Sequence, residues 1–293
     1  MFVKTRRDGF LFSAVNTFII TLFSLIVIFP FWYILSTSIT EYDTFSAKNG
    51  LILYPQNISL SNYIHILGNG GLFLTAYTNT IINTLFGTII GVMITSFAAY
   101  ALSEKKLPGR KPLILYFLIT MFFNGGMIPT YITIKNLNLY DTRIVLILVL
   151  CFLVYHLVIM KSFFENIPDS LKESAMIDGA TEPVILFKIV IPLSMPVLAT
   201  ISLFTIVIFW NDFFHAMLYV SDPLKQPIQL VLRNIMASSA LPPEMLADAK
   251  HTTPPIIGIQ TASIVIVAFP MMILYPFLQK YFEKGILIGA VKG

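Results

Sequence analysis

No charged side chain occurs between Asp8 and Glu41, and residues 12–34 within this stretch are almost entirely apolar. A helix of about 20 apolar residues is long enough to cross the hydrocarbon core of a bilayer. The stretch is too long for the apolar region of a cleaved signal peptide, and no small-residue cleavage site follows it. The sequence therefore predicts a retained transmembrane anchor.

Five more apolar stretches of similar length follow, separated by polar connections. They cover approximately residues 76–102, 113–134, 144–163, 189–210 and 257–278. Gly87 and Gly91 have the spacing that lets two helices approach closely, so the 76–102 helix should contact protein rather than lipid. An Asn-Gly-Gly sequence at 124–126 and Pro129 interrupt the next stretch. We expect an all-α polytopic membrane protein with six transmembrane helices.

Composition supports the membrane class and excludes several others. The chain is 56% hydrophobic and 12% charged, against roughly a quarter charged residues in soluble domains. Its pI of 9.0 could suit nucleic acid, but the basic residues form no aromatic-studded face, so we expect lipid and no nucleic acid as a partner. Cys151 is the only cysteine and His156 lies alone in an apolar stretch, so both are interpreted as packing residues and no metal site is predicted.

The distribution of Lys and Arg predicts the orientation of the spans. Three precede the first span, four lie in 103–112, three in 161–188 and three in 280–293, whereas the connections on the other side hold six. Because Lys and Arg are enriched on the cytoplasmic side, both termini and the loop at 165–188 are predicted to be cytoplasmic.

The polar segment ENIPDSLKESAMIDGATEPVILFKIVIP, residues 165–192, separates the fourth and fifth spans. It predicts a short helix capped by Asn166, with Pro168 and Asp169 in its first turn, where a missing N–H costs little and a negative charge suits the helix dipole. Gly179 should end this helix, because glycine accepts the left-handed backbone found at helix C-termini.

A second helix is predicted to start at Thr181, followed by Glu182 and Pro183, and to run into the apolar sequence ILFKIVIPL. The result is a small polar helix fixed to the next span.

The segment resembles the cytoplasmic loop of the inner-membrane subunits of ATP-binding-cassette importers. That family has Glu-Ala-Ala, then three residues and a Gly, then Ile and Leu-Pro near the next span. The matching positions are Glu173-Ser174-Ala175, Asp178-Gly179-Ala180, Ile189 and Pro192. Ser174 replaces Ala and Ile191 replaces Leu, and both replacements are close in size.

The resemblance implies that the first helix docks into a cleft on an ATPase subunit, with Glu173 at the contact. The residues assigned to this ATPase coupling are Leu171, Glu173, Ser174, Ala175, Ile177, Asp178, Gly179 and Ala180. Ordinary solvated loop charges remain the alternative for Glu173 and Asp178.

Two further blocks resemble the carbohydrate-importing branch of this family, which includes the maltose permeases. Residues 125–148 are similar to a Met/Ile-Pro-x-Tyr element followed by an Asn-Leu-Gly-Leu turn, with Asn138 at the glycine position. Residues 209–222 are similar to a Trp-Asn-Asp/Glu-Phe element. The sequence GGMIPTY is most similar to the corresponding region of permeases from polysaccharide-utilisation operons.

The resemblance implies a type I importer permease in the bacterial inner membrane, forming half of a sugar pathway, with an oligosaccharide expected. Its partners would be a second homologous permease subunit in a heterodimer, two ATP-binding-cassette ATPase subunits and an extracytoplasmic solute-binding protein. No Gly-rich phosphate loop with Lys-Ser/Thr is present. ATP and Mg are therefore expected on the ATPase subunits, and this chain should have no catalytic residue and no cofactor of its own.

The resemblance also suggests contacts outside the loop at 165–188, here called the coupling loop. The C-terminal residues assigned to the ATPase are Val291, Lys292 and Gly293. In the long external loop at 211–255, the residues assigned to the binding protein are Ser238, Pro242 and Glu244. A loop of that length is uncommon without a function, although a disordered spacer is the alternative.

Four polar residues near or within the spans are candidates for the substrate pathway. Asn79 and Asn83 lie four apart on one helix face and could line the pathway or bond to a neighbouring helix, the second being favoured. Asn211 and Asp212 follow the fifth span and could contact substrate or cap the helix.

The predicted domain organisation follows the spans: a cytoplasmic N-terminus (1–11), the first transmembrane helix (12–34), an external loop (35–75) with a surface helix near SLSNYIHIL, a core permease domain (76–280) and a cytoplasmic tail (281–293). An ion-coupled secondary transporter should show two related halves and intramembrane charges. A membrane-embedded transferase should show convergent carboxylates or histidines. Neither pattern is evident, so both remain alternatives of lower rank.

Overall fold

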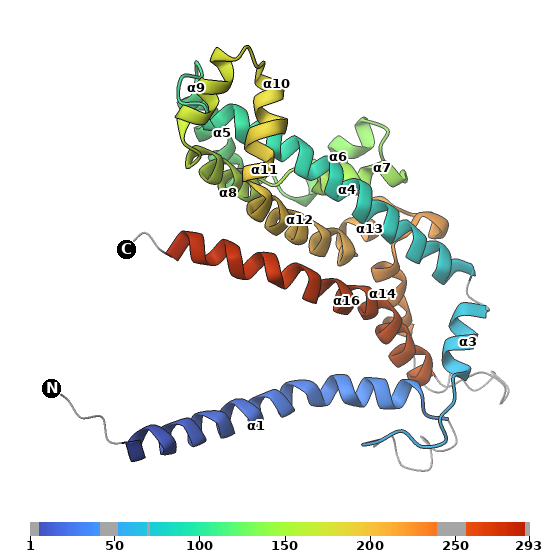
Figure 1. The fold of residues 1–293 in the computed structure, drawn as a ribbon. Coiled ribbons are helices and arrows are strands. Elements are labelled where there is room, and N and C mark those ends of the chain that lie inside the picture. The colour runs from blue at the N-terminus through green and yellow to red at the C-terminus, as the bar shows by residue number, and fades with distance from the viewer. Residues whose placement is uncertain (1–5, 42–51, 69–70, 239–255, 291–293) are drawn as a thin grey trace. The chain divides into compact units, whose positions relative to one another are not determined.

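A computed structural model describes residues 6–41, 52–68, 71–238 and 256–290. Within these ranges the chain is helical, and its only β pairing is one isolated bridge between Thr40 and Ile58. The longer helices are α1 (Arg6–Ser38), α4 (Gly71–Ser103), α5 (Arg110–Phe122), α8 (Val154–Glu165), α12 (Met195–Trp210), α14 (Ile228–Ser238) and α16 (Ile256–Ala290). The shorter ones are α3 (Ser61–Gly68), α6 (Met127–Asn136), α7 (Arg143–Leu150), α9 (Asp169–Ile177), α10 (Glu182–Ile185), α11 (Ile191–Leu193) and α13 (Phe214–Tyr219). Figure 1 labels these elements.

Among the described residues, three helical segments are long and apolar enough to cross a membrane unbroken: Phe12–Ser38 of α1, the whole of α4, and Ile256–Leu274 of α16. Three further pairs of helices qualify when each bent pair is taken as one span. The pairs are α5 with α6 (bent by 112°), α7 with α8 (49°) and residues 182–193 with α12 (83°). Six spans result, in agreement with the predicted fold class.

The break between α5 and α6 lies at the predicted Asn-Gly-Gly sequence. Gly126 has a φ of 92°, a conformation that glycine adopts without a steric penalty. The side-chain Oδ1 of Asn124 accepts a hydrogen bond from the Gly126 N–H at 2.9 Å, closing an Asx turn. The interruption is therefore a defined turn, sharper than a kink within one helix.

The break between α7 and α8 has no proline or glycine and was not predicted. It leaves the Cys151 carbonyl beside Gly91 of α4, where an added Cβ would lie 2.7 Å from the carbonyl oxygen. At Gly87 an added Cβ would overlap the Phe209 ring of α12. The predicted close approach of α4 to protein is confirmed, and both glycines are required by it.

The predicted fifth span, 189–210, is not one continuous helix. Pro192 has no N–H and its ring crowds the carbonyl four residues earlier, and the preceding turn, Leu186–Val190 (η1), is a wider π-helix. The helix bends at Ser194, and α12 restarts at Met195 with Pro196 in its first turn, where proline is tolerated.

By its internal contacts the chain forms two compact units, one of residues 1–71 and 234–268 and the other of residues 72–233 and 269–293. In the first unit Ser38 is a focus of contacts. Its carbonyl accepts a hydrogen bond from the Asn62 side chain at 3.1 Å, and its hydroxyl lies 2.7 Å from the Tyr63 hydroxyl. Asn62 and Tyr63 belong to α3, which confirms the predicted surface helix.

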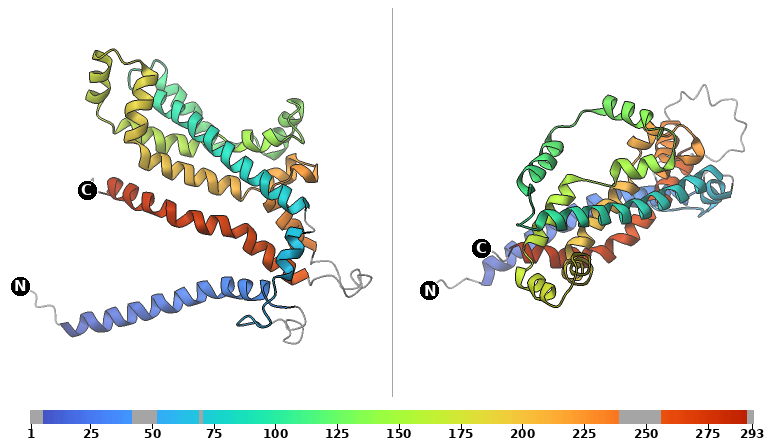
Figure 2. Two further views of the ribbon diagram at one scale, coloured as in Figure 1. Left: turned by 45° about the vertical axis from the view of Figure 1, so that its right-hand side comes forward. Right: turned by 90° about the horizontal axis from the view of Figure 1, so that it is seen from above.

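The second unit contains α4 to α13, and α4 extends along it. Figures 1 and 2 show α4 running from the end that holds α9 to the end that holds α13. We refer to these as the α9 end and the α13 end. Buried apolar side chains form one cluster at each end. The α8 cluster comprises Ala99, Leu102, Leu157, Met160, Phe164, Ile167, Ile185, Leu186, Val190, Val197, Leu198 and Ile201. The α13 cluster comprises Ile134, Val145, Leu146, Ala216, Tyr219, Val220 and Leu230.

A polar contact region, here called the Asp141 clasp, adjoins the α13 cluster. The Asp141 carboxylate accepts hydrogen bonds from the backbone N–H of Ser221 at 3.0 Å and of Asp222 at 2.9 Å. The Lys225 ammonium donates to the Asp141 carboxylate at 3.2 Å and to its carbonyl at 2.8 Å. Asp141 itself has a φ of 57°. The clasp joins the connection before α7 to the segment after α13.

Candidate functional site

The loop between α8 and α12 contains the predicted polar helix, and its start differs from the prediction. Asn166 does not cap α9. It ends α8 instead, and its side-chain amide donates to the Ser162 carbonyl at 2.7 Å. Pro168 occupies the cap position of α9 without a side-chain hydrogen bond, and Asp169 begins the helix. Because only three residues join the helices, Asn166 serves as the end of one and cannot begin the next.

The end of α9 agrees with the prediction. Gly179 has a φ of 79°, and its N–H donates to the Met176 carbonyl at 3.0 Å, while the Ala180 N–H donates to the Ala175 carbonyl at 2.9 Å. These two bonds form a Schellman motif. Thr181 then occupies the cap position of α10, as predicted. The turn after α9 is thus fixed by backbone geometry.

The structure brings the eight predicted coupling residues together on α9 and its turn. Exposed among them are Leu171, Glu173, Ser174, Ile177, Asp178 and Gly179. Ile177 is 87% exposed, an unusual state for an isoleucine at a helix end. Ala175 and Ala180 point the other way and pack against the α8 cluster. The helix therefore has one face in the protein and one face free.

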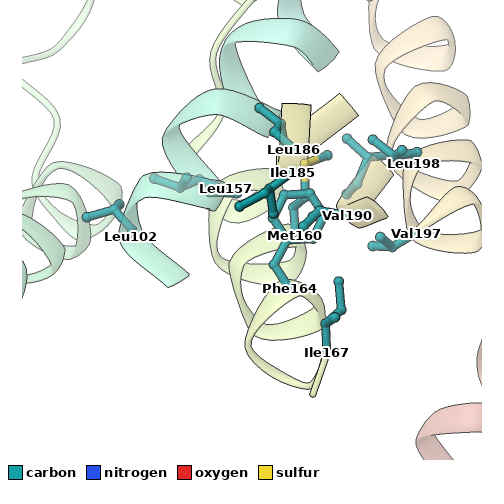
Figure 3. Close-up of a cluster of buried hydrophobic side chains, with 12 residues drawn as sticks. Leu102, Leu157, Met160, Phe164, Ile167, Ile185, Leu186, Val190, Val197 and Leu198 are labelled. Atoms are coloured by element: carbon teal, nitrogen blue, oxygen red, sulfur yellow. The ribbon is translucent and has the colours of Figure 1, made fainter. Parts of the chain in front are cut away.

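The α8 cluster forms the base on which this loop rests. Figure 3 shows Leu157, Met160 and Phe164 of α8 meeting Ile185 and Val190. The last two belong to α10 and η1, the elements that follow the loop. Phe164 and Met160 are fully buried. Since apolar contacts of this density resist separation, the loop and the helices on either side of it form one packed body.

Polar contacts connect the same loop to the end of α4. Lys172 of α9 is only 5% exposed, and its ammonium lies 5.8 Å from the centre of the Tyr100 ring. The Tyr100 hydroxyl donates to the Glu182 carboxylate. Lys105, just beyond α4, lies 3.3 Å from the Asp169 carboxylate. The sequence reasoning missed Lys172, because nothing in a polar loop marks one lysine as buried.

A polar pocket of about 320 Å³ lies between α9 and the turn that follows α4. Its lining residues are Glu104, Lys105, Lys106, Asp169, Lys172, Glu173, Met176 and Glu182. Both signs of charge are present among these residues. Glu173 is thus both exposed and part of this pocket.

A second ion-pair group supports the turn after α4. Arg110 and Lys161 both contact the Glu165 carboxylate, the lysine at 2.8 Å. Arg110 also donates from Nε to the Leu102 carbonyl at 2.8 Å. These partly buried groups connect the start of α5 to the end of α8, so Arg110 has a structural role.

The pathway candidates occupy different environments. The Asn79 amide donates to the carbonyls of Leu224 at 2.8 Å and Gln226 at 3.1 Å, in the connection between α13 and α14. Asn83 is 4% exposed, and its side-chain nitrogen has no hydrogen-bond partner.

The other two candidates close the end of α12. Asn211 accepts a hydrogen bond from Gln229 at 3.2 Å. The Asp212 carboxylate accepts from the backbone N–H of His215 at 3.2 Å and lies 2.8 Å from its Nδ1. Both side chains are therefore engaged where α12 gives way to α13.

An apolar crevice of about 280 Å³ runs along α4. Its lining residues are Ile81, Thr84, Leu85, Thr88, Ile89, Ile206, Trp210, Pro270, Met271 and Leu274. The hydroxyls of Thr84 and Thr88 are buried without a hydrogen-bond partner. Buried polar groups are normally paired, so this face of α4 has hydrogen-bonding capacity that the chain itself leaves unused.

Several predicted contacts lie outside the described residues. These are Pro242, Glu244, Val291, Lys292 and Gly293. Ser238 is the last residue of α14, and its side chain is likewise not described. Among the residues that the structure covers, no group of three or more His, Cys, Asp or Glu side chains is arranged to hold a metal ion.

Comparisons with known proteins relate this arrangement to a family. The family model described as binding-protein-dependent transport system inner membrane component matches residues 2–288. The polygalacturonan/rhamnogalacturonan transport system permease protein YtcP of Bacillus subtilis (strain 168) is 41% identical over 273 residues, covering 93% of this chain and 95% of that protein. Protein LplC of the same strain is 40% identical, covering 99% and 98%.

A solved structure agrees with this result. One chain in the crystal structure of a bacterial ABC transporter involved in the import of the acidic polysaccharide alginate has a TM-score of 0.88 and 32% identity. The match covers 96% of this chain and 100% of that chain. The chain thus belongs to the family of binding-protein-dependent transport system inner membrane components, with the type I importer permease fold.

Proposed function

We propose that this chain forms half of the translocation pathway of an importer for acidic oligosaccharides, and that α9 couples it to the ATPase. The observation that carries the proposal is the free face of α9. It combines an exposed carboxylate, Glu173, with the exposed apolar side chain of Ile177 one turn further on. An exposed apolar side chain rimmed by polar groups is typical of a protein interface.

The base of α9 supports the same role. A coupling element has to pass a displacement on instead of absorbing it by fraying. The Schellman turn at Gly179 and the α8 cluster beneath Ala175 and Ala180 meet this requirement. Movement of a docked ATPase would then reach α8, α10 and α12 together.

We further propose the remaining partners and the orientation. A second homologous permease completes the pathway, two ATPase subunits hold ATP and Mg, and an external binding protein delivers substrate. Both termini and α9 lie in the cytoplasm, which is consistent with the concentration of Lys and Arg in those segments. The C-terminal residues 291–293 add a second ATPase contact, and residues 238–244 contact the binding protein.

The crevice along α4 is the strongest candidate for this chain's share of the pathway. Thr84 and Thr88 keep unused hydrogen-bonding groups there, which could serve sugar hydroxyls or the partner permease. The acidic character of the sugar is inferred from the relatives, which are a polygalacturonan/rhamnogalacturonan transport protein and an alginate importer.

Purification from native membranes tests the coupling role. Tagged wild-type protein is compared with Glu173→Arg, and with Glu41→Arg, which makes the same change at an exposed position predicted to be external. We expect a second permease and an ATPase to accompany the wild type and Glu41→Arg, and the ATPase to be lost from Glu173→Arg. Recovery of the chain alone in all three samples would contradict the proposal.

Uptake measurements test the substrate class. Cells lacking this chain should fail to take up labelled short oligogalacturonides, while uptake of neutral malto-oligosaccharides stays normal. If the wild-type chain restores this uptake and Glu173→Arg does not, import of the substrate depends on the contact made by α9. Loss of neutral sugar uptake alone would contradict the acidic substrate while leaving the permease role intact.

A further inference from the structure

One helix contacts both the coupling loop and the segment that leads to the predicted binding-protein contact. This helix is α4, a continuous helix of 33 residues with no internal proline. At its α13 end, one turn forms hydrogen bonds to residues 224–228. At its α9 end, Tyr100 contacts the coupling loop. These two contact regions lie 21 positions apart in sequence, which is about 32 Å along a helix.

The contacts at the α13 end are buried and directional. Asn79 is 3% exposed and Thr80 1% exposed. In addition to the two bonds from Asn79, the Thr80 hydroxyl accepts a hydrogen bond from the Ile228 N–H at 2.7 Å and donates to the Ala76 carbonyl at 3.0 Å. Ile228 is the first residue of α14. Thr80 therefore satisfies an N–H at the beginning of α14 that no residue of that helix can pair.

The contacts at the α9 end hold the coupling loop at three points. Lys172 packs over the Tyr100 ring, the Tyr100 hydroxyl bonds Glu182, and Lys105 pairs with Asp169. The first two involve a residue of α4 itself. They place Tyr100 against α9 on one side and against the first turn of α10 on the other.

The middle of α4 is packed too closely to slide past its neighbours. Gly91 adjoins the Cys151 carbonyl and Gly87 adjoins the Phe209 ring. The Ser96 hydroxyl lies 3.3 Å from the Met160 sulfur of α8. These three positions hold α4 against its neighbours, and the helix has no internal proline at which it could kink, so a displacement at one end is passed along it.

We infer that α4 is the strut that connects the coupling loop to the segment 224–228 and α14, and that Thr80 and Tyr100 are the positioning residues at its two ends. Movement of α9 reaches the start of α14 through α4, so the ATPase and the external binding protein sense each other through this helix. The inference rests on the proposed function, since it assumes an ATPase at α9 and a binding protein beyond α14.

The experiment measures ATP hydrolysis by the wild-type complex, co-purified from native membranes, with and without its binding protein and short oligogalacturonides. Thr80→Val removes the hydroxyl and keeps the shape. Tyr100→Phe removes only the hydroxyl that bonds Glu182. Thr80→Ser restores a hydroxyl, and Thr78→Val removes one that is exposed and bonds only within α4.

We expect Thr80→Val and Tyr100→Phe each to reduce stimulation by the binding protein at least about fivefold, the lower range of allosteric couplings. Basal hydrolysis and subunit composition should stay normal. Thr80→Ser and Thr78→Val should resemble the wild type. Because both residues act through one strut, their effects should not add. The double variant Thr80→Val/Tyr100→Phe should lose no more stimulation than the single variant that loses more.

Normal stimulation of Thr80→Val or of Tyr100→Phe would overturn the inference while leaving the proposed function standing. The same would follow if the fold-loss of stimulation in the double variant equalled the product of the fold-losses in the two single variants. Absence of stimulation in the wild type would instead overturn the proposed function and this inference with it. If Thr80→Val does not assemble, Tyr100→Phe decides the question, because it changes a partly exposed hydroxyl at the opposite end.

Discussion

The α9 end and the α13 end of the second unit are stabilised in different ways. At the α9 end, buried apolar side chains from α4, α8, α10, η1 and α12 pack beneath a loop whose polar contacts are largely exposed. At the α13 end, a smaller apolar cluster adjoins directional hydrogen bonds around Asp141 and Asn79. Apolar packing tolerates small reorientations, whereas hydrogen bonds fix an angle as well as a distance. The loop at the α9 end therefore rests on contacts that tolerate small reorientations, whereas the α13 end is held by contacts that fix its geometry.

The largest effect should come from the α8 cluster. Phe164→Ala leaves a cavity at a fully buried position and should lower the free energy of unfolding by about 3–5 kcal/mol. Phe122→Ala makes the same change where the ring is 74% exposed and should cost within about 0.5 kcal/mol. Denaturant unfolding in detergent measures both. Equal losses from the two variants would show that this cluster does not dominate the stability of the α9 end.

Left-handed backbone positions occur at both ends and allow a matched comparison. Gly179 has a φ of 79° and Asn138 a φ of 55°. Replacing either by Val should cost about 1–2 kcal/mol, because a β-branched residue is strained there. Nothing lies within 4 Å of a Cβ added at Gly179, so this cost is purely conformational. Gly179→Asn and Asn138→Gly should be mild. Thermal unfolding measures the stability of each variant. If Gly179→Val were as stable as the wild type, the Schellman turn would be ruled out.

The Asp141 clasp should respond locally. Asp141→Ala removes the acceptor for the Ser221 and Asp222 N–H groups, so hydrogen exchange at these amides should become several-fold faster. Asp141→Asn keeps an oxygen acceptor and tolerates a positive φ, so it should protect the amides while losing the pairing with Lys225. If both variants exchange at the same rate, the charge and not the backbone hydrogen bonds closes the clasp.

The smallest effect should be that of pH on the same clasp. Hydrogen bonds from the Asp222 backbone and from Lys225 lower the pKa of Asp141 from its ordinary 3.8, and the bond to Asp141 raises the pKa of Lys225 from its ordinary 10.5. Stabilisation by Asp141 is present above pH 3.8 and is lost as the pH falls through its folded pKa. Stabilisation by Lys225 is present below pH 10.5 and is lost as the pH rises through its folded pKa. Exchange at Ser221 and Asp222, corrected for the intrinsic rate, should stay constant between these limits, and an opening near neutral pH would contradict the assignment.

The features predicted correctly from sequence are those set by local backbone chemistry. Gly179 and Thr181 mark the end of one helix and the start of the next because their preferences act over a few residues. Asn124 and Gly126 mark the break between α5 and α6 for the same reason. The prediction that Asn166 caps α9 was wrong, because a residue that suits a helix start is equally able to end the preceding helix.

The remaining features depend on contacts between distant parts of the chain. The partners of Asn79 lie 145 and 147 positions away, so the sequence could offer a bond to another segment but could not name it. The bend after α7 has no glycine or proline of its own. The residue that accommodates it is Gly91 of α4, which lies against the Cys151 carbonyl. Burial of Lys172 likewise follows from the position of Tyr100, which no local pattern reveals.

The length of α4 bears on the surrounding lipid. A helix of 33 residues rises about 50 Å, whereas the hydrocarbon core of a bilayer is about 30 Å thick. An isolated helix relieves such a hydrophobic mismatch by tilting. Because α4 is bonded to other parts of the protein near both of its ends, those contacts set its angle to its neighbours, and any tilt that relieves the mismatch must be shared by the elements bonded to it.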